Sequence, residues 1–228
     1  MALIDKLTAI ADAIRGKTGK TDEMTLDQMA TEIAGIETGS GYYNEDLVRK
    51  MIEVKGTDIT EFVIPDGCTQ IGHSAFRAWT YLEKLVIPNS VTTLGNSALS
   101  LCYALTDIQL PDGITYIGDS AFNSSDVSFM TKLPDSLRTI GSTAFQYSRG
   151  LFITEIPAGV TSIGKQAFQQ CTELTALTFK GTPTSIQSNA FQNCNNLVTI
   201  NVPWAEGAVA NAPWGATNAT INYNYTGG

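Results

Sequence analysis

The sequence contains very few of the side chains on which most catalytic and metal sites depend. It has a single histidine, His73, and four cysteines that lie far apart, with no Cys-x-x-Cys pair. One histidine excludes multi-histidine metal sites and most histidine-dependent catalysis, and four scattered cysteines cannot build a disulfide-dense scaffold. The chain also lacks a phosphate-binding loop, a G-x-S-x-G or H-E-x-x-H motif and a dinucleotide fingerprint. The sequence therefore predicts no enzyme activity, no catalytic residues, no metal and no cofactor.

Basic residues and long apolar runs are also scarce. The chain has 14 lysines and arginines against 22 acidic residues, which gives a net charge of -8 and an isoelectric point near 4.6. Such a charge disfavours binding to nucleic acid or to an anionic membrane surface. No apolar run approaches the ~20 residues that span a bilayer, and charged residues such as Asp5 and Lys6 interrupt the first apolar stretch. We therefore expect no signal peptide, no membrane insertion and no nucleic-acid partner.

What the chain has in abundance is internal repetition, with a constant step of 23 residues. Proline returns at this step from Pro65 to Pro157, and the same phase continues through Lys180 to Pro203. An Ile-Gly or Leu-Gly pair and an Ala-Phe or Ala-Leu pair keep the same register. The consensus unit is L-x-x-I-x-I-P-x-x-(V/I/L)-T-x-I-G-x-x-A-F-x-x-C. Three columns in phase without an insertion indicate a repeat architecture.

Each part of the unit predicts a local structure. L-x-x-I-x-I alternates like a short strand with one buried face, as at Leu85 and Ile87, and the proline ends that strand because it has no N–H for the ladder. V-T-x-I-G predicts a second short extended segment closed by glycine, and A-F-x-x-C predicts one helical turn whose Phe and Cys face the interior. A single unit cannot bury its apolar side alone, so successive units must stack. The expected fold is an α/β solenoid with short strands and helical turns.

The unit resembles the BspA-type leucine-rich repeat of bacterial and protist surface proteins in its I-P-x-x-V-T-x-I-G-x-x-A-F-x-x-C pattern. The resemblance covers about residues 59–203. It departs from the ordinary leucine-rich unit, because Pro and Ile-Gly columns replace the usual N/C-x-L column. The resemblance implies a curved, right-handed leucine-rich-repeat solenoid that binds proteins or cell surfaces and has no enzyme activity.

The segments on either side of the repeats complete the expected domain organisation. Residues 1–37 carry two apolar stripes at helical spacing and predict an N-terminal α-helical hairpin for attachment, assembly or self-association. Residues 38–58 predict a linker and an N-terminal capping helix, residues 59–202 the repeats, and residues 203–228 a C-terminal cap. The stretches KLTAIADAIRGKTG and MTLDQMATEIAGI are similar to the start of tail-associated proteins encoded by prophages of gut bacteria.

Three residue types leave a choice of interpretation. Trp204 and Trp214 suit either an end cap or a carbohydrate-binding platform, and the position after the last repeat favours the cap. Cys171 and Cys194 occupy one column of adjacent units, where we expect buried free thiols because parallel Cβ vectors do not favour a disulfide. His73 occupies a variable column, where we expect a surface residue.

One local anomaly marks a candidate binding site in the fourth and fifth repeats. Thr131 and Thr154 occupy the slot that holds a buried Ile or Leu in other units. Either a local register adjustment tucks the aromatic residues inside, or the apolar residues form an exposed patch of the kind that marks interaction sites. The apolar residues are Phe129, Met130, Phe152 and Ile153, and the polar rim of such a patch consists of Tyr147, Arg149, Lys132 and Glu155.

Together these features favour a non-enzymatic binding module whose solenoid recognises a protein or a surface glycan. A phage or prophage tail component and a cell-surface adhesin both fit this description. The alternative is a structural spacer or assembly protein with no ligand site on the solenoid. A chain without a signal peptide is expected to be virion-associated or to act outside the cell if it derives from a phage, and to be cytoplasmic otherwise.

Overall fold

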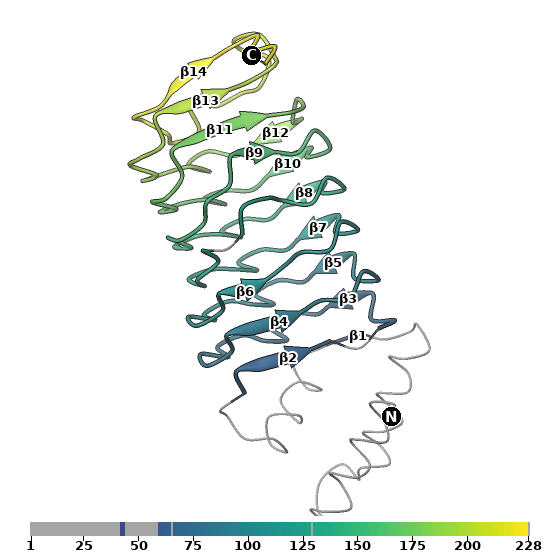
Figure 1. The fold of residues 1–228 in the computed structure, drawn as a ribbon. Helices are drawn as coiled ribbons and strands as arrows, with labels where there is room; N and C mark the ends of the chain where they lie inside the picture. Colours follow the sequence, from purple (N-terminus) through teal and green to yellow (C-terminus); the bar gives the residue numbers. More distant parts are fainter. Residues whose placement is uncertain (1–41, 44–58, 65, 129, 228) are drawn as a thin grey trace, which may run out of the picture.

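The computed structural model describes residues 42–43, 59–64, 66–128 and 130–227, which form a parallel β-solenoid (Figure 1). The polypeptide advances by one coil for each 23-residue unit, so equivalent residues of successive units lie side by side. The predicted hairpin at residues 1–37 lies outside the described residues.

One face of the solenoid carries an unbroken seven-stranded parallel sheet. From β3 onward each strand comes from the extended segment before the Ala-Phe turn, which ends in Ile-Gly or Leu-Gly in every unit except the last, where Gln187 follows Ile186. Each strand pairs with the equivalent segment of the adjacent unit, as Ile71 pairs with Leu94. The first residue of each of these strands is at least partly exposed and the second is buried. In spatial order the strands are β1 (Tyr42–Tyr43), β3 (Gln70–Ile71), β5 (Thr93–Leu94), β7 (Tyr116–Ile117), β8 (Thr139–Ile140), β10 (Ser162–Ile163) and β12 (Ser185–Ile186).

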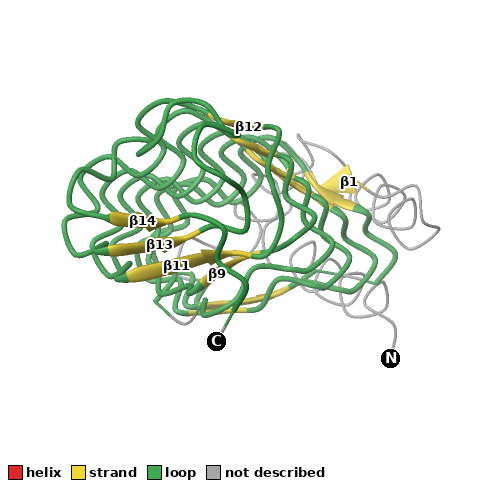
Figure 2. Cartoon of the chain, turned by 90° about the horizontal axis from the view of Figure 1, so that it is seen from above, coloured by secondary structure: helices red, strands yellow, loops and turns green. Residues whose placement is uncertain are grey.

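A second face, which we call the strand face, carries the strands that precede the proline column. Figure 2 shows it on the side of the solenoid away from β12. It consists of two separate parallel sheets of three and four strands. The first contains β2 (Glu61–Val63), β4 (Lys84–Val86) and β6 (Asp107–Ile108), and the second contains β9 (Glu155–Ile156), β11 (Ala176–Phe179), β13 (Thr199–Asn201) and β14 (Thr220–Asn222).

The Ala-Phe segments form turns and not the predicted helical turns. Two residues in each segment have a left-handed backbone, as in Ser74 with φ of 54° and Ala78 with φ of 62°. Alternate amides donate to the next coil, as Phe76 N–H does to the carbonyl of Ala98 at 2.8 Å, whereas Arg77 N–H donates back to Ser74 at 3.0 Å. Because half of the amides are used between coils, no helical hydrogen-bond series forms. The predicted α/β class is therefore wrong for the described residues, which contain strands and turns but no helix.

The core consists of ladders of identical side chains. Phe122, Phe145, Phe168 and Phe191 are fully buried and stack with ring centroids 5.2–5.3 Å apart and planes within 7° of parallel. The two middle rings, Phe145 and Phe168, therefore each pack against the ring of the coil before and that of the coil after. Burial of such side chains stabilises the fold by about 1.5–3 kcal/mol each, so the stack couples neighbouring coils.

The C-terminal tryptophans close the last coil. Trp204 and Trp214 are 6% and 1% exposed. Trp204 packs edge-to-face on Phe179 with centroids 5.2 Å apart, and the indole N–H of Trp214 donates to the carbonyl of Ala210 at 2.7 Å. Buried indoles cannot act as a flat platform for a sugar ring, and the role of residues 203–228 as a C-terminal cap stays a prediction.

The last column of the unit provides hydrogen bonds as well as packing. Its cysteines are buried free thiols, as predicted, and Cys171 donates from Sγ to the carbonyl of Phe145 in the preceding coil at 3.0 Å. Ser148 takes the equivalent position and donates to Phe122 at 2.7 Å. Burial raises the pKa of the Cys194 thiol to about 12, so the thiol stays protonated and able to donate. The small residue thus gives a buried carbonyl a second hydrogen bond, because the same carbonyl already accepts from a backbone amide, as Phe145 does from Ser148 N–H at 3.1 Å.

Candidate functional site

The predicted binding cluster divides between the interior and the surface. Met130 and Ile153 are only 4% and 1% exposed, so both belong to the core. Phe152 is 46% exposed, and Phe129 lies outside the described residues. The exposed apolar patch is therefore wrong as predicted, because two of its four members are buried.

A one-residue shift in the burial pattern explains this outcome. Thr131 and Thr154 occupy the slot that is buried in other units, yet both are exposed. Met130 and Ile153, one residue earlier, take the buried position instead. Burying an aliphatic side chain is favourable, whereas burying a hydroxyl without a partner costs free energy. The predicted register adjustment, which placed the aromatic residues inside, is therefore wrong for Phe152. Phe152 lies on the surface, and the aliphatic Met130 and Ile153 are buried instead.

The shift interrupts the sheet on the strand face between β6 and β9. Within the described part of the chain, no backbone hydrogen bond joins residues 107–110 to residues 130–134, and none joins residues 130–134 to residues 153–157. On the seven-stranded face the same neighbouring coils stay paired through β7 and β8. Coil four, which contains residues 130–134, is therefore joined to its neighbour on one face and not on the other.

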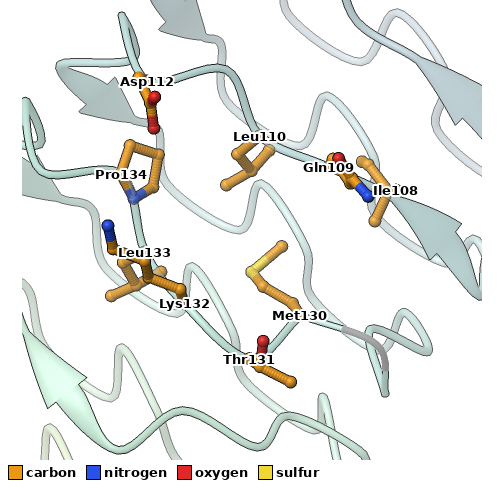
Figure 3. Close-up of a pocket in the computed structure, with 9 residues that line it drawn as sticks. All are labelled: Ile108, Gln109, Leu110, Asp112, Met130, Thr131, Lys132, Leu133 and Pro134. Atoms are coloured by element: carbon orange, nitrogen blue, oxygen red, sulfur yellow. The ribbon is translucent and has the colours of Figure 1, made fainter.

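A hollow of about 230 Å³ lies at this interruption. Figure 3 shows Leu110 and Met130 facing each other across it, with Asp112 and Pro134 at one side. Met130 and Leu133 are buried and give the hollow an aliphatic floor. We call it the coil-four hollow, and its lining residues are Ile108, Gln109, Leu110, Asp112, Met130, Thr131, Lys132, Leu133 and Pro134.

The rim of the coil-four hollow is net negative. Lys132 Nζ lies 2.9 Å from Asp135 Oδ2, and both side chains are well exposed. The hydrogen bond to Asp135 raises the pKa of Lys132, and the charges of Asp135, Asp112 and Glu155 act in the same direction. Glu155 also pairs with Lys180 at 2.8 Å. Three carboxylates thus surround two ammonium groups.

The predicted rim residues Tyr147 and Arg149 do not line the hollow. Tyr147 is 42% exposed and sits in an Ala-Phe turn with a left-handed φ of 60°. Arg149 is exposed, and its amide donates to the carbonyl of Tyr147 at 2.9 Å. Of the eight predicted site residues, the structure brings Met130 and Lys132 to the hollow. The binding roles of Phe152, Tyr147 and Arg149 stay predictions.

Sequence reasoning missed the half of the hollow that belongs to the third unit. Ile108, Leu110 and Asp112 occupy regular repeat columns, so they look like ordinary core and turn positions. Only the threonines in the buried slot signalled a change, because a hydroxyl there predicts that the strand does not continue in register. That signal locates the interruption but not the hollow beside it.

The remaining features are His73, possible metal-binding clusters and possible membrane-spanning helices. His73 is exposed, as predicted. Over the described ranges, no cluster of three or more His, Cys, Asp or Glu side chains is placed to bind a metal ion. In the same residues no helix has the length and apolar character needed to cross a membrane.

The repeat and the stacked coils define a leucine-rich-repeat solenoid. A family model described as the BspA type leucine rich repeat region matches residues 54–151 and 128–206, with six copies. The chain therefore belongs to the BspA-type leucine-rich repeat family, and the resemblance seen in the sequence is confirmed.

Solved structures of bacterial leucine-rich repeat proteins share the fold. The T. pallidum leucine-rich repeat protein is 26% identical with a TM-score of 0.52, and the match covers 64% of this chain and 73% of that one. A leucine-rich repeat protein from Bacteroides ovatus is 27% identical with a TM-score of 0.50, over 62% of this chain and 39% of that one. The chain thus spans well under half of the B. ovatus protein. The search of curated proteins gives no match.

Proposed function

We propose that the chain is a non-enzymatic recognition module that binds a protein or a surface glycan through its strand face. The observation that carries the proposal is the interruption at coil four, where an otherwise regular face presents a hollow with an aliphatic floor. Concave sites with an apolar floor and a few polar groups are typical of ligand binding. A backbone held on its other face by a continuous sheet loses little conformational entropy on binding.

An exposed aromatic side chain in the next coil supports the same role. Phe152 belongs to coil five and is 46% exposed. Aromatic residues are enriched among the side chains that dominate binding energy, whereas an isolated exposed aliphatic residue is common on any protein. Val198 stands in the same column two coils further on and is 55% exposed, so it offers a matched comparison.

The setting that we propose is a bacterial cell surface or a virion, as an adhesin or as a phage or prophage tail component acting outside the cell. Support comes from the BspA-type repeat and from the similarity of the N-terminal sequence to prophage tail-associated proteins. In this proposal residues 1–37 provide attachment or self-association. Light scattering on the full chain and on a chain that starts at Tyr42 tests that role, because equal monomeric masses and no partner for the full chain would contradict it.

The binding role is tested with glycan and surface-protein arrays probed by the full chain. Phe152→Ser should weaken binding to any captured ligand about tenfold, as expected for the loss of an aromatic anchor. Val198→Ser should change the affinity by less than about twofold. Equal effects of the two substitutions on the affinity would contradict a binding role for Phe152.

The second candidate function is a rigid spacer. The unbroken seven-stranded sheet favours it, because a continuous ladder from β1 to β12 maintains a fixed separation between the ends of the solenoid. In that case the arrays should capture no ligand, and substitutions on the strand face should be neutral for assembly.

A further inference from the structure

The interruption on the strand face leaves main-chain groups without partners. In the described residues, the amides of Thr131 and Lys132 donate to no backbone carbonyl. Both residues are exposed, so their amides are accessible to a ligand. The corresponding amide of Thr178 in coil six donates to Thr154 at 2.9 Å. The ladder is therefore complete beyond coil five and open at coil four.

Open sheet edges favour one kind of ligand. Unpaired N–H and C=O groups in a row are a template for another extended chain. In strand addition, main-chain hydrogen bonds provide affinity and a pocket for alternate side chains provides specificity. The coil-four hollow lies directly beside the open edge of β6, so both elements of this recognition mode are present.

The size of the hollow limits what it accepts. Its volume of about 230 Å³ lies below the range of roughly 300–1,000 Å³ that is usual for small-molecule and cofactor sites. Leu110, Met130 and Leu133 line it, so it suits one aliphatic side chain.

The charges around the hollow determine which residues of the ligand are favoured next to the inserted side chain. Asp112 lines the hollow and makes no ion pair in the described structure, whereas Lys132 is engaged by Asp135. Glu155 adds a further negative charge beside Lys132. The chain as a whole carries -8. A basic residue next to the inserted side chain is therefore attracted, and an acidic one is repelled.

We propose that the coil-four hollow binds an extended segment of a partner protein, in which an aliphatic side chain enters the hollow and an adjacent lysine or arginine faces Asp112. The main chain of this segment pairs with the open edge between β6 and residues 131–133. The proposal deepens the proposed function by naming the partner class, and it rests on that function.

The experiment uses the full chain and a fluorescently labelled synthetic peptide with a central leucine, a lysine on each side and serine and threonine flanks. Fluorescence anisotropy should give saturable binding below about 1 mM. Replacing the central leucine by serine, or both lysines by glutamate, should weaken binding at least about tenfold. No saturable binding by the first peptide, or equal binding of all three, overturns the proposal.

Matched variants of the protein locate the site. Thr131→Trp should fill the hollow and weaken peptide binding at least about tenfold, whereas Thr154→Trp, at the equivalent position of coil five, should change it less than about twofold. Asp112→Asn should weaken binding of the lysine peptide, and Asp66→Asn, in the same turn column two coils earlier, should not. Equal effects within either pair overturn the assignment.

The failure of this proposal is distinguishable from failure of the proposed function. If the arrays capture a glycan whose binding depends on Phe152 while the peptide does not bind, the recognition role stands and the peptide site is wrong. If the arrays capture nothing and the peptide does not bind, both are wrong.

Discussion

The two sheet-bearing faces of the solenoid come from the same repeat, yet only one of them is continuous. The seven-stranded face keeps a strand in every unit from β3 to β12, whereas the strand face splits at coil four. On the continuous face a glycine follows each strand from β3 to β10. A Cβ on Gly95 would lie 2.7 Å from the carbonyl carbon of Gly72, and one on Gly141 would lie 2.6 Å from that of Gly118. The backbones of successive coils must therefore approach closely there.

The strand face has no such requirement. Its unit contains alternating apolar residues and a proline, and neither forces adjacent backbones together. A shift of one residue at Met130 and Ile153 can therefore break the pairing without a steric clash, while the core remains filled. The comparison shows that the glycine column keeps the strands of the seven-stranded face paired from coil to coil. The strand face has no such column, so its pairing can be lost at one coil, and the hollow lies where it is lost.

The largest effect is expected in the core that both faces share. Phe168 stacks between Phe145 and Phe191 with centroids 5.3 Å away on each side. Phe168→Ala should lower the free energy of unfolding by about 3–5 kcal/mol and loosen neighbouring coils. Phe152→Ala, on the exposed ring, should cost about 0.5 kcal/mol or less. Chemical denaturation measures both, and a loss below about 1 kcal/mol for Phe168→Ala would show that the repeat register is wrong.

The next effect tests the shifted register on the strand face. Ile153 is 1% exposed and Thr154 is exposed. Ile153→Ala should therefore cost about 2–5 kcal/mol, and Met130→Ala a similar amount. Thr154→Ala should stay within about 0.5 kcal/mol of the wild type. If the two aliphatic substitutions cost only a few tenths of a kcal/mol, the side chains of Met130 and Ile153 are exposed and their burial is contradicted.

A smaller effect distinguishes the glycine column from other glycines. Gly141→Ala places a methyl group against the backbone of the preceding coil and should destabilise the protein by about 1–3 kcal/mol. Gly113→Ala is the control, because its nearest contact would be the carbonyl oxygen of Asn89 at 3.4 Å. We expect the control to be neutral or slightly stabilising, since alanine restricts the unfolded chain. Thermal denaturation of the two variants gives the difference, and equal melting temperatures would contradict the close-approach argument.

The sequence predicts the regular part of the fold well because each column has one physical task. Proline marks the end of a strand, Ile-Gly marks the segment that pairs between coils, and Phe168 and its equivalents mark the stack. The spacing of the Ala-Phe segment predicts a helical turn, and this prediction is wrong. Its amides bond to the next coil, as Phe76 does to Ala98, and a single unit contains no information about that neighbour.

The site was less predictable for a related reason. The threonines at 131 and 154 mark the change of register, but their sequence does not decide whether Phe152 or Ile153 turns inward. The decision depends on the space left by adjacent coils, and the core accepts the aliphatic residue. The hollow then forms from Leu110 of one unit and Met130 of the next, a pairing that follows only from the interruption itself.

The smallest free energy of local opening is expected at coil four. Amide hydrogen exchange measures this opening free energy on both faces, so it compares them directly. The amide of Gly141 donates to the carbonyl of Ile117 at 2.8 Å on the continuous face, so it should exchange with deuterium only through opening of several coils. The amides of Thr131 and Lys132 have no backbone acceptor among the described residues. Their opening free energy should be close to zero, as at mobile loops.

Native-state hydrogen exchange followed by NMR resolves these amides in one experiment on the unmodified chain. Binding of the leucine-lysine peptide should then slow exchange at Thr131 and Lys132 and leave Gly141 unchanged, because only the open edge gains main-chain partners. If the amide of Lys132 exchanges as slowly as that of Gly141 without any peptide, the strand face is paired through coil four in solution. The hollow would then have no open edge beside it, and strand addition at this site would be ruled out.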